Sequence, residues 1–286
     1  MLRIEDIAQL RALRASWRSQ NQRVAFVPTM GNLHSGHLKL VRHAAQQADK
    51  VIVSIYVNPM QFGANEDLAT YPRTLEADMQ ALFDLNVNAV FTPRSEDIYP
   101  RGIEAQTFIE VPGLSGMLCG DSRPGHFRGV ATIVNKLFNM VQPDIAVFGK
   151  KDYQQLQVIR TMVADLALDI DIQGVDTERE VSGLAKSSRN GYLSPEEQAQ
   201  AASIYAELSR VALHVRDGAH DFATLQAEAM ANLAHAGLEP EYLVIRRCRD
   251  LSEAQAGDAP ADLVVLVAAR LGSTRLIDNL EVATVR

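Results

Sequence analysis

Runs of apolar residues alternate with helix-like patterns over the first two-thirds of the chain. The runs are apolar throughout rather than at every second position, which is typical of strands in a parallel sheet covered on both faces. The predicted strands span residues 24–28, 51–57, 89–91, 107–111 and 145–149. Helical periodicity predicts helices at 4–17, after 36, and at about 74–86, 130–141 and 156–166. This order predicts an α/β fold with a Rossmann-like, doubly wound parallel sheet.

The pattern changes at about residue 178, where a segment rich in Gly and Ser begins. Two helical stretches and two apolar runs follow it, at 195–215, 222–236, 242–247 and 263–269. A chain of 286 residues is long for one domain. We therefore expect a Rossmann-like domain at 1–177 and a smaller α+β domain at 178–286, which includes the Ser-Ser-Arg segment at 187–189.

Composition narrows the possible partners and compartments. The formal net charge of −7 argues against a large nucleic-acid surface, because neutralising phosphates requires a clustered excess of Lys and Arg. Cys119 and Cys248 lie far apart and form no CxxC motif, which favours a reducing compartment over a disulfide framework. The N-terminus has no signal-peptide layout, and the longest strongly apolar run is too short to span a bilayer. We expect a cytoplasmic protein with neither a membrane nor a nucleic-acid partner.

The segment PTMGNLHSGH, residues 28–37, lies where the first long strand ends and a helix begins. Ligands of doubly wound sheets bind at such strand ends, and a helix N-terminus offers N–H groups to phosphate. His34 and His37 are three residues apart. If Ser35 caps the helix, both rings can face one side and donate hydrogen bonds to phosphate oxygens as charge develops.

Two simpler interpretations of His34 and His37 remain open. The pair could hold a metal, but zinc requires three or four ligands, and no other Cys/His cluster in the sequence supplies them. If the motif stood alone, two structural histidines would be about as probable as a phosphate site.

Two further segments follow predicted strands. In VNPMQFGANEDLATYPRT, the Gln61 amide can donate and accept at once, which suits a small substrate that carries a carboxylate and hydroxyls. Asp78, in the next helix, could reach a metal, but an acid on a solvated helix face is the more common case. In FGKKDYQQL, Lys151 could neutralise phosphate charge, and Asp152 could cap a helix or contact magnesium.

Two loops carry basic residues. LAKSSRN combines hydroxyls with the guanidinium of Arg189, which could form a mobile clamp for a polyphosphate, although most Ser/Arg loops are solvated linkers. DSRPGHFRG adds Arg123, His126 and Arg128, which are candidates either for the site or for structural and dimer contacts.

Five segments, in this order, resemble the signature series of the pantothenate synthetases: PTMGNLHSGH, VNPMQFG, RPGHFRGV, FGKKDYQQL and GLAKSSRNGYL. The resemblance runs from Arg23 to the C-terminus. The first segment alone would indicate only the HxGH nucleotidyltransferase superfamily, which includes class I aminoacyl-tRNA synthetases. The resemblance implies a ligase that condenses (R)-pantoate with β-alanine. Its products would be pantothenate, AMP and pyrophosphate, formed through a pantoyl-adenylate.

The resemblance also implies roles for single residues. His37 is expected to donate a proton, while His34, Lys151 and Arg189 stabilise charge on the phosphoryl oxygens. Gln61 is expected to bind pantoate and β-alanine, and Gln155 to bind pantoate. The residues expected to bind ATP are Met30, Gly31, Asn32, Leu33, His34, Ser35, Gly36, His37, Gly149, Lys150, Lys151, Asp152, Glu178, Lys186, Ser187, Ser188 and Arg189.

Three positions depart from the usual family pattern. Glu178 stands where an aliphatic residue often touches the adenine ring, Ser182 where an acid is more common, and Lys186 where an apolar residue is more common. Lys186 could add a phosphate contact. The resemblance further implies ATP as a substrate, Mg²⁺ across its phosphates with unassigned protein ligands, and a homodimer.

Two alternative functions stay open. An adenylyltransferase that releases an adenylated product would use the same elements and would not need β-alanine. A nucleotide-binding regulatory or scaffold module that has lost its chemistry would bind ATP and release no AMP under any substrate mixture.

Overall fold

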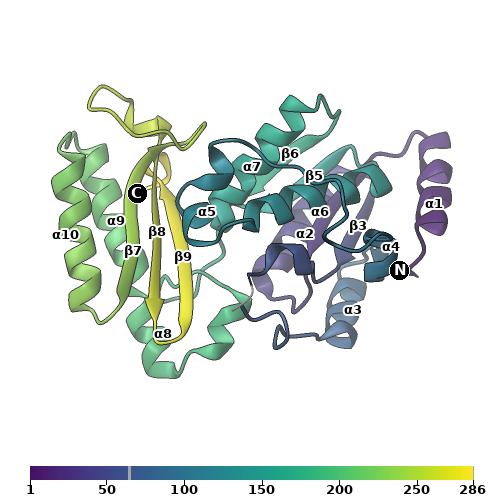
Figure 1. The fold of residues 1–286 in the computed structure, drawn as a ribbon, viewed down its shortest axis with the longest axis horizontal. Coiled ribbons are helices and arrows are strands. Elements are labelled where there is room, and N and C mark those ends of the chain that lie inside the picture. The colour runs from purple at the N-terminus through teal and green to yellow at the C-terminus, as the bar shows by residue number, and fades with distance from the viewer. Residues whose placement is uncertain (64–65, 286) are drawn as a thin grey trace. The chain divides into compact units, whose positions relative to one another are not determined.

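The computed structural model describes residues 1–63 and 66–285 (Figure 1). The chain forms two compact units. The first comprises Met1–Gly149 and Val158–Asp176, and the second comprises Lys150–Gln157 and Thr177–Arg286. The domain boundaries expected from the sequence, 1–177 and 178–286, stay a prediction, and positions 64, 65 and 286 within them lie outside the described residues.

The first unit contains a six-stranded sheet in the order β1-β4-β3-β2-β5-β6, and all its described pairings are parallel. Its strands are β1 (Leu2–Ile4), β2 (Val24–Thr29), β3 (Lys50–Ile55), β4 (Ala89–Phe91), β5 (Ile145–Gly149) and β6 (Asp171–Val175). From β2 the chain first builds β3 and β4 on one side, and later places β5 and β6 on the other. The expected doubly wound sheet is therefore confirmed, and its topological switch point lies between β2 and β5.

Helices cover both faces of this sheet. On one face, Val41 of α2 and Leu82 of α3 pack against inward residues of the sheet such as Val27. On the other, Phe138 of α6 makes edge-to-face contacts with Phe26 and Phe148, with ring centroids 6.4 and 6.3 Å apart. The helices assigned here are α1 (Ile7–Ser19), α2 (Ser35–Gln47), α3 (Leu75–Asp84), α4 (Ser95–Ile98), α5 (Cys119–Ser122), α6 (His126–Val141) and α7 (Tyr153–Asp165).

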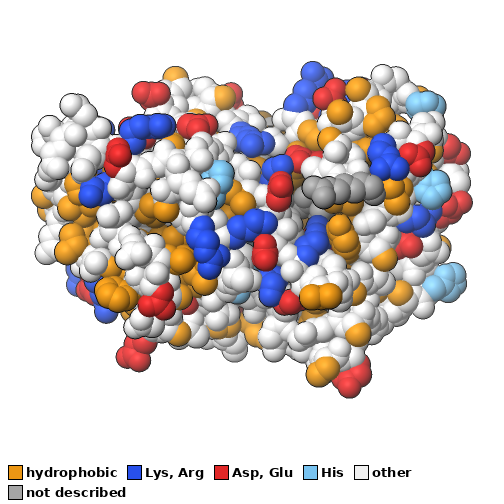
Figure 2. All heavy atoms as spheres, turned by 180° about the vertical axis from the view of Figure 1, so that it is seen from behind, with side chains coloured by type: hydrophobic (Ala, Val, Ile, Leu, Met, Phe, Trp, Pro, Cys, Tyr) orange, Lys and Arg blue, Asp and Glu red, His pale blue; other side chains and the backbone are white. Residues whose placement is uncertain are grey.

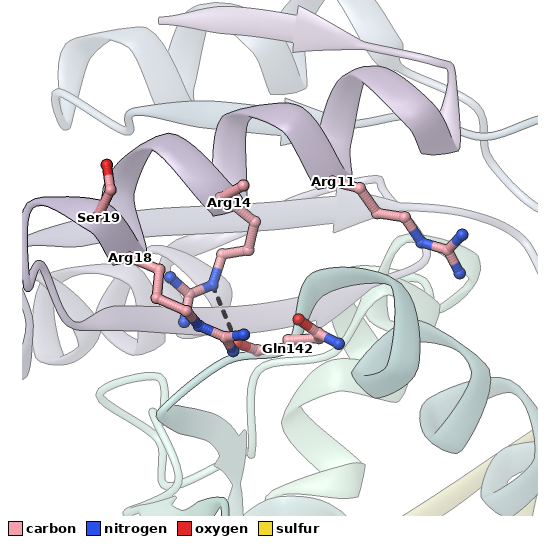
Figure 3. Close-up of a pocket in the computed structure, with 6 residues that line it drawn as sticks. Arg11, Arg14, Arg18, Ser19 and Gln142 are labelled. Atoms are coloured by element: carbon pink, nitrogen blue, oxygen red, sulfur yellow. Dashed lines mark hydrogen bonds between the residues drawn. The ribbon is translucent and has the colours of Figure 1, made fainter.

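The Arg14 side chain links α1 to the C-terminal end of α6 (Figure 3). Its Nε donates to the carbonyl oxygens of Val141 and Gln142 at 3.2 and 2.9 Å, and its Nη2 lies 3.1 Å from the Asp144 carboxylate. These carbonyls have no partner within the helix, so a buried guanidinium, 4% exposed, satisfies them. Arg11 and Arg18 line the neighbouring pocket on the same helix. We assign this arginine cluster a structural role at the start of β5.

The second unit contains a three-stranded antiparallel sheet in the order β7-β8-β9. Its strands are β7 (Glu239–Arg247), β8 (Leu263–Leu271) and β9 (Thr274–Glu281), and its helices are α8 (Pro195–Ala201), α9 (Ser203–Arg216) and α10 (Phe222–His235). Leu208 of α9 and Leu233 of α10 belong to one apolar core with Val265 and Val267 of β8. This arrangement confirms the expected smaller α+β region.

Several predicted elements were wrong or missed. Ile4 belongs to the short strand β1 rather than to the first helix. Residues 107–111 form no strand: the Ile109 backbone bonds the Thr132 hydroxyl instead of a neighbouring strand. The stretch 195–215 is two helices, which meet at Ala202. Strands β6 and β9 were not predicted, because polar residues interrupt their apolar patterns.

Within residues 1–63 and 66–285, no helix is long and apolar enough to cross a membrane. Figure 2 shows Lys and Arg side chains interspersed with Asp and Glu on the face in view. This mixed surface agrees with the moderate negative net charge of −7.

Candidate active site

The loop after β2 leads directly into α2, and its histidines form the helix cap. Gly31 and Asn32 take positive φ values of 83° and 50°, which turn the chain from the strand into the helix. His34, rather than the expected Ser35, is the N-cap residue, because its Nδ1 accepts the Gly36 N–H at 3.1 Å. The Ser35 hydroxyl is buried and has no hydrogen-bond partner within the described residues.

The same contacts indicate which tautomer each neutral ring adopts. His37 Nδ1 accepts the backbone N–H of His34 at 3.3 Å, just as His34 Nδ1 accepts that of Gly36. A ring nitrogen that accepts a hydrogen bond carries no proton, so each neutral imidazole holds its proton on Nε2. The ring centroids are 4.1 Å apart. Nε2–H donors on two neighbouring rings at a strand end suit the binding of phosphate oxygens.

The Asp78 carboxylate, on α3, anchors this loop through the loop's backbone. Asp78 is 3% exposed, and its two carboxylate oxygens accept the backbone N–H groups of Asn32 at 2.9 Å and Leu33 at 2.8 Å. Thr74 adds a hydroxyl donor at 3.2 Å. A Cβ on Gly31 would lie 3.1 Å from Asp78 Oδ2. The solvated acid expected from the sequence was wrong, because the Asp78 carboxylate is a buried anchor for the loop, and the possible metal contact stays a prediction.

Gln61 ends the short 3-10 helix η1 (Pro59–Gln61), and a chain of hydrogen bonds fixes its amide. Tyr99 donates to Asn58 Oδ1 at 2.6 Å, and Asn58 Nδ2 donates to Gln61 Oε1 at 3.2 Å. Gln61 Nε2 then contacts Met30 Sδ at 3.1 Å. Asn58 is 1% exposed, and burial raises the pKa of Tyr99 well above its usual value, so Tyr99 stays a donor. The structure thus brings Met30 and Gln61 together and fixes the Gln61 Nε2 group as the donor.

In the second unit, strand β9 anchors the Lys150–Asp152 turn. Asn279 Nδ2 donates to the carbonyl oxygens of Lys150 at 2.9 Å and Lys151 at 2.7 Å. Glu281 pairs with Lys150 Nζ at 2.8 Å and accepts the Tyr153 hydroxyl at 2.9 Å. Lys150 is therefore bound to an acid of its own unit, whereas Lys151 Nζ lies at a longer distance, 4.0 Å, from the Asp152 carboxylate.

The segment that carries Lys186 is a short hairpin anchored by the same strand. Arg179 and Ala185 form a β-bridge, and the Lys186 N–H donates to the Glu178 carbonyl at 2.8 Å. Arg179 bonds the buried Asp278 carboxylate through both terminal nitrogens, at 2.6 and 3.0 Å. Burial raises the pKa of Asp278, and the Arg179 hydrogen bonds and charge oppose this effect.

The Ser-Ser-Arg loop, residues 187–189, follows directly after this anchored hairpin. Ser187 Oγ accepts the Arg189 N–H at 3.2 Å, and the Asn190 side chain bonds the Ala185 carbonyl at 3.0 Å. Lys186 Nζ pairs with Glu180 at 3.0 Å, so its charge has a local partner. Ser188 begins the 3-10 helix η4 (Ser188–Tyr192).

The remaining predicted residues lie close to these groups in sequence. Gly149 ends β5, beside the switch point, and Gln155 lies in the first turn of α7. The sequence argument missed Asn58, Tyr99, Asp278, Asn279 and Glu281. An Asp-Asn pair inside an apolar alternation, as in RLIDNLE, is the signal that could have identified the anchoring strand.

Over the described part of the chain, no group of three or more His, Cys, Asp or Glu side chains is placed to hold a metal ion. The nitrogens of His34 and His37 that face the backbone are used as hydrogen-bond acceptors. The zinc interpretation of this pair therefore has no support from the described residues.

A doubly wound sheet with two adjacent histidines after β2 defines an α/β protein of the kind that holds ligands at the carboxyl ends of its strands. Comparison with known proteins identifies the family. The model of the pantoate-beta-alanine ligase family matches residues 3–281, and the chain belongs to this family of ligases.

Similar proteins cover almost the whole chain. A pantothenate synthetase of Idiomarina loihiensis is 59% identical over 279 residues, which cover 98% of this chain and 97% of that protein. The crystal structure of a pantothenate synthetase from Thermus thermophilus matches with a TM-score of 0.89 at 42% identity, covering 99% of both chains. A pantoate-beta-alanine ligase from Francisella tularensis, solved in complex with beta-gamma ATP and β-alanine, matches with a TM-score of 0.82 at 35% identity. It covers 99% of this chain and 98% of its own.

Proposed function

We propose that this protein joins (R)-pantoate to β-alanine at the expense of ATP, through a pantoyl-adenylate, in pantothenate and coenzyme A biosynthesis. Family membership and the ATP and β-alanine bound to the Francisella relative support the substrates. The observation that carries the chemical proposal is that His34 Nδ1 and His37 Nδ1 each accept a backbone N–H, from which we infer an Nε2–H on each neutral ring. Two neutral donors side by side suit a phosphoryl group whose charge grows during the reaction.

A free carboxylate does not acylate an amine at neutral pH, because oxide would have to leave. In the proposed first step, a pantoate carboxylate oxygen attacks the α-phosphorus of ATP and pyrophosphate leaves. In the second step, the β-alanine amine attacks the acyl carbon, the bridging oxygen leaves with AMP, and the ammonium formed loses a proton. Catalysis of this kind depends on positioning and on stabilising charge on the phosphoryl oxygens.

The proposed roles follow the family resemblance. Met30–His37 and Gly149–Asp152 bind ATP, and His37 is the proton donor. Gln61, with its amide N–H directed by Asn58, binds pantoate and β-alanine, and Gln155 binds pantoate. By the same resemblance, Glu178, Lys186–Ser188 and Arg189 are also proposed to bind ATP, with Lys151 and Arg189 stabilising charge on its phosphoryl oxygens.

Mg²⁺ is proposed to enter on the ATP phosphates, where it would neutralise charge. The residues of the site fit this role better than that of a resident metal cage, because both Asp78 oxygens already accept backbone N–H groups. We further propose a homodimer, on the family resemblance, and a cytoplasmic location, because Cys119 and Cys248 lie far apart and form no CxxC motif.

The first experiment measures AMP, pyrophosphate and pantothenate with ATP and Mg²⁺, with pantoate and β-alanine each present or omitted. AMP that requires both substrates and equals pantothenate supports the ligase. An adenylated product accumulating without β-alanine would favour the adenylyltransferase, and absence of turnover in every mixture would favour the binding module. Pantoate labelled with ¹⁸O in its carboxylate tests the intermediate: the adenylate transfers one label to AMP, and unlabelled AMP contradicts it.

A further inference from the structure

The segment 123–129, RPGHFRG, contacts the backbone of Gln61. His126, at the start of α6, places Nδ1 2.8 Å from the Gln61 carbonyl oxygen and Nε2 3.0 Å from Arg123 Nη1. A carbonyl oxygen can only accept, so Nδ1 carries the proton and Nε2 accepts from the guanidinium. This is the opposite tautomer from that of His34 and His37.

Arg123 supports the same carbonyl and fixes the ring. Its Nη2 lies 3.5 Å from the Gln61 oxygen, and its Nε and Nη2 bond the Glu66 carboxylate at 2.6 and 2.5 Å. Burial acts to raise the pKa of Glu66, but the hydrogen bonds and charge of Arg123 lower it below its usual value. The guanidinium is thus held in place by an ionised carboxylate while it orients His126.

Gly129, one turn further along α6, lets the two backbones touch. A Cβ at this position would lie 2.5 Å from the Met60 carbonyl oxygen and 2.7 Å from Gln61 Cα, both closer than a real Cβ contact. The Gly129 carbonyl in turn accepts the Asn58 side-chain N–H at 3.2 Å. Any larger residue would push η1 away from the helix.

We propose that His126, Arg123 and Gly129 are positioning residues, which set the place of the Gln61 amide for the carboxylate- and hydroxyl-bearing substrate. This inference rests on the proposed function of Gln61. Asn58 and Tyr99 orient the amide at the end of the side chain, whereas the segment 123–129 fixes the backbone from which that side chain starts. A displacement of the backbone carries the amide with it, and a misplacement of about 1 Å can cost a hundredfold in rate.

Arg128 supplies a matched control within the same segment. It pairs with Glu110 at 3.1 Å and lies over the Phe108 ring at 4.5 Å, and it makes no described contact with Gln61. Removing it alters the charge of the segment without touching the Gln61 carbonyl.

The test compares His126→Ala, His126→Asn, His126→Gln and Arg128→Ala in the full-length protein. Steady-state kinetics give KM for pantoate, KM for ATP and kcat, and thermal melting reports folding. We expect His126→Ala to raise KM for pantoate about tenfold, the effect of losing one well-placed hydrogen bond, while KM for ATP and Tm change little. Asn can place a donor where Nδ1 stands, so KM for pantoate in His126→Asn should return most of the way to that of the unmodified protein. His126→Gln should behave like His126→Ala. Arg128→Ala should behave like the unmodified protein.

A double-mutant cycle with Gln61→Ala decides whether His126 acts through Gln61. If it does, His126→Ala raises KM for pantoate far less in the Gln61→Ala background than alone. Additive effects, an unchanged KM in His126→Ala, or rescue by Gln and not by Asn would overturn the inference. If His126→Ala does not fold, His126→Asn and Gly129→Ala carry the test, and a Gly129→Ala variant that folds with an unchanged KM for pantoate also overturns it. Failure of the proposed function is seen separately, as an unmodified protein without pantoate-dependent turnover or a Gln61→Ala variant with unaltered KM.

Discussion

The carboxylate of Asp78 lies 2.9 Å from the backbone nitrogen of Asn32, although the two residues are 46 positions apart in the sequence. Its second oxygen accepts the Leu33 N–H, so one side chain of α3 determines the path of the loop that carries His34 and His37. A buried carboxylate that accepts two amide hydrogens is costly to replace, because its partners are then left without an acceptor.

Asp78→Asn should therefore damage ATP turnover more than its small change in volume suggests. The new amide keeps one acceptor and turns an N–H₂ group toward a backbone N–H, so we expect about 1–3 kcal/mol of lost stability. We also expect a lower kcat, because the two histidines follow the loop. Steady-state kinetics measures kcat, and chemical unfolding measures the free energy of unfolding. Glu76→Gln, on the same helix, is the control. Equal kinetics in the two variants would show that Asp78 does not set the loop.

His37→Ala should slow adenylation by a factor on the order of one hundred, as expected for the loss of one preorganised donor. The Nε2–H tautomer assigned to His37 also predicts how its Gln and Asn replacements should differ. His37→Gln can extend an amide N–H toward the position of Nε2, whereas His37→Asn places its amide nearer to Nδ1. Pyrophosphate release in a single turnover should therefore recover partly in the Gln variant and not in the Asn variant. Similar rates for all three replacements would contradict the assigned Nε2–H donor.

Asn279 should matter to catalysis through Lys151. Its amide bridges the carbonyl oxygens of Lys150 and Lys151, so Asn279→Leu leaves both without this donor and releases the turn. We expect kcat to fall by about tenfold or more, while Lys151→Ala in the Asn279→Leu background adds less than it does alone. Arg275→Lys, on the same strand, is the control. A kcat unaffected by Asn279→Leu would show that the contact from β9 does not support catalysis through Lys151.

The sequence predicted the elements whose signals are local. Glycines and histidines at the end of a wholly apolar strand were sufficient to place the 28–37 loop, and Gln61 followed from the same logic one strand later. The anchors beneath these residues could not be predicted in this way. Asp78 and Asn279 act across 46 and 128 positions, and an acid on a helix or an amide in a strand has no periodic signature that reports such a partner.

Local rules also gave the wrong N-cap and missed a charge partner. Ser is a common N-cap, yet His34 takes that position, because its ring reaches the Gly36 N–H and the Ser35 side chain is turned away into the protein. The possible phosphate contact of Lys186 stays a prediction, but no signal in the sequence indicated that Glu180 would lie 3.0 Å from its ammonium group. Charge partners of this kind depend on the folded hairpin, which the segment's composition alone did not predict.

The pair formed by Arg179 and Asp278 predicts a specific dependence of stability on pH. Asp278 is buried and its pKa is raised, and Arg179 is its cationic partner, with its guanidinium also 4.0 Å from the Tyr205 ring centre. Arg179→Met keeps the packing on Tyr205 and leaves the carboxylate alone in the core. Breaking a buried pair in this way costs about 3–5 kcal/mol when the remaining group is charged.

The sign follows from proton linkage. An unfolded Asp has a pKa of about 3.9, and the raised pKa of the folded variant means that the folded state binds more protons above that value. The stability of Arg179→Met should therefore fall as pH rises from about 4, by up to about 1.4 kcal/mol per unit, until the folded pKa is passed. Chemical unfolding at several pH values measures this slope, and Arg179→Met combined with Asp278→Asn should lack it. A single variant that grows more stable with rising pH, or a double variant with the same slope, would show that the Asp278 carboxyl is not the group that responds.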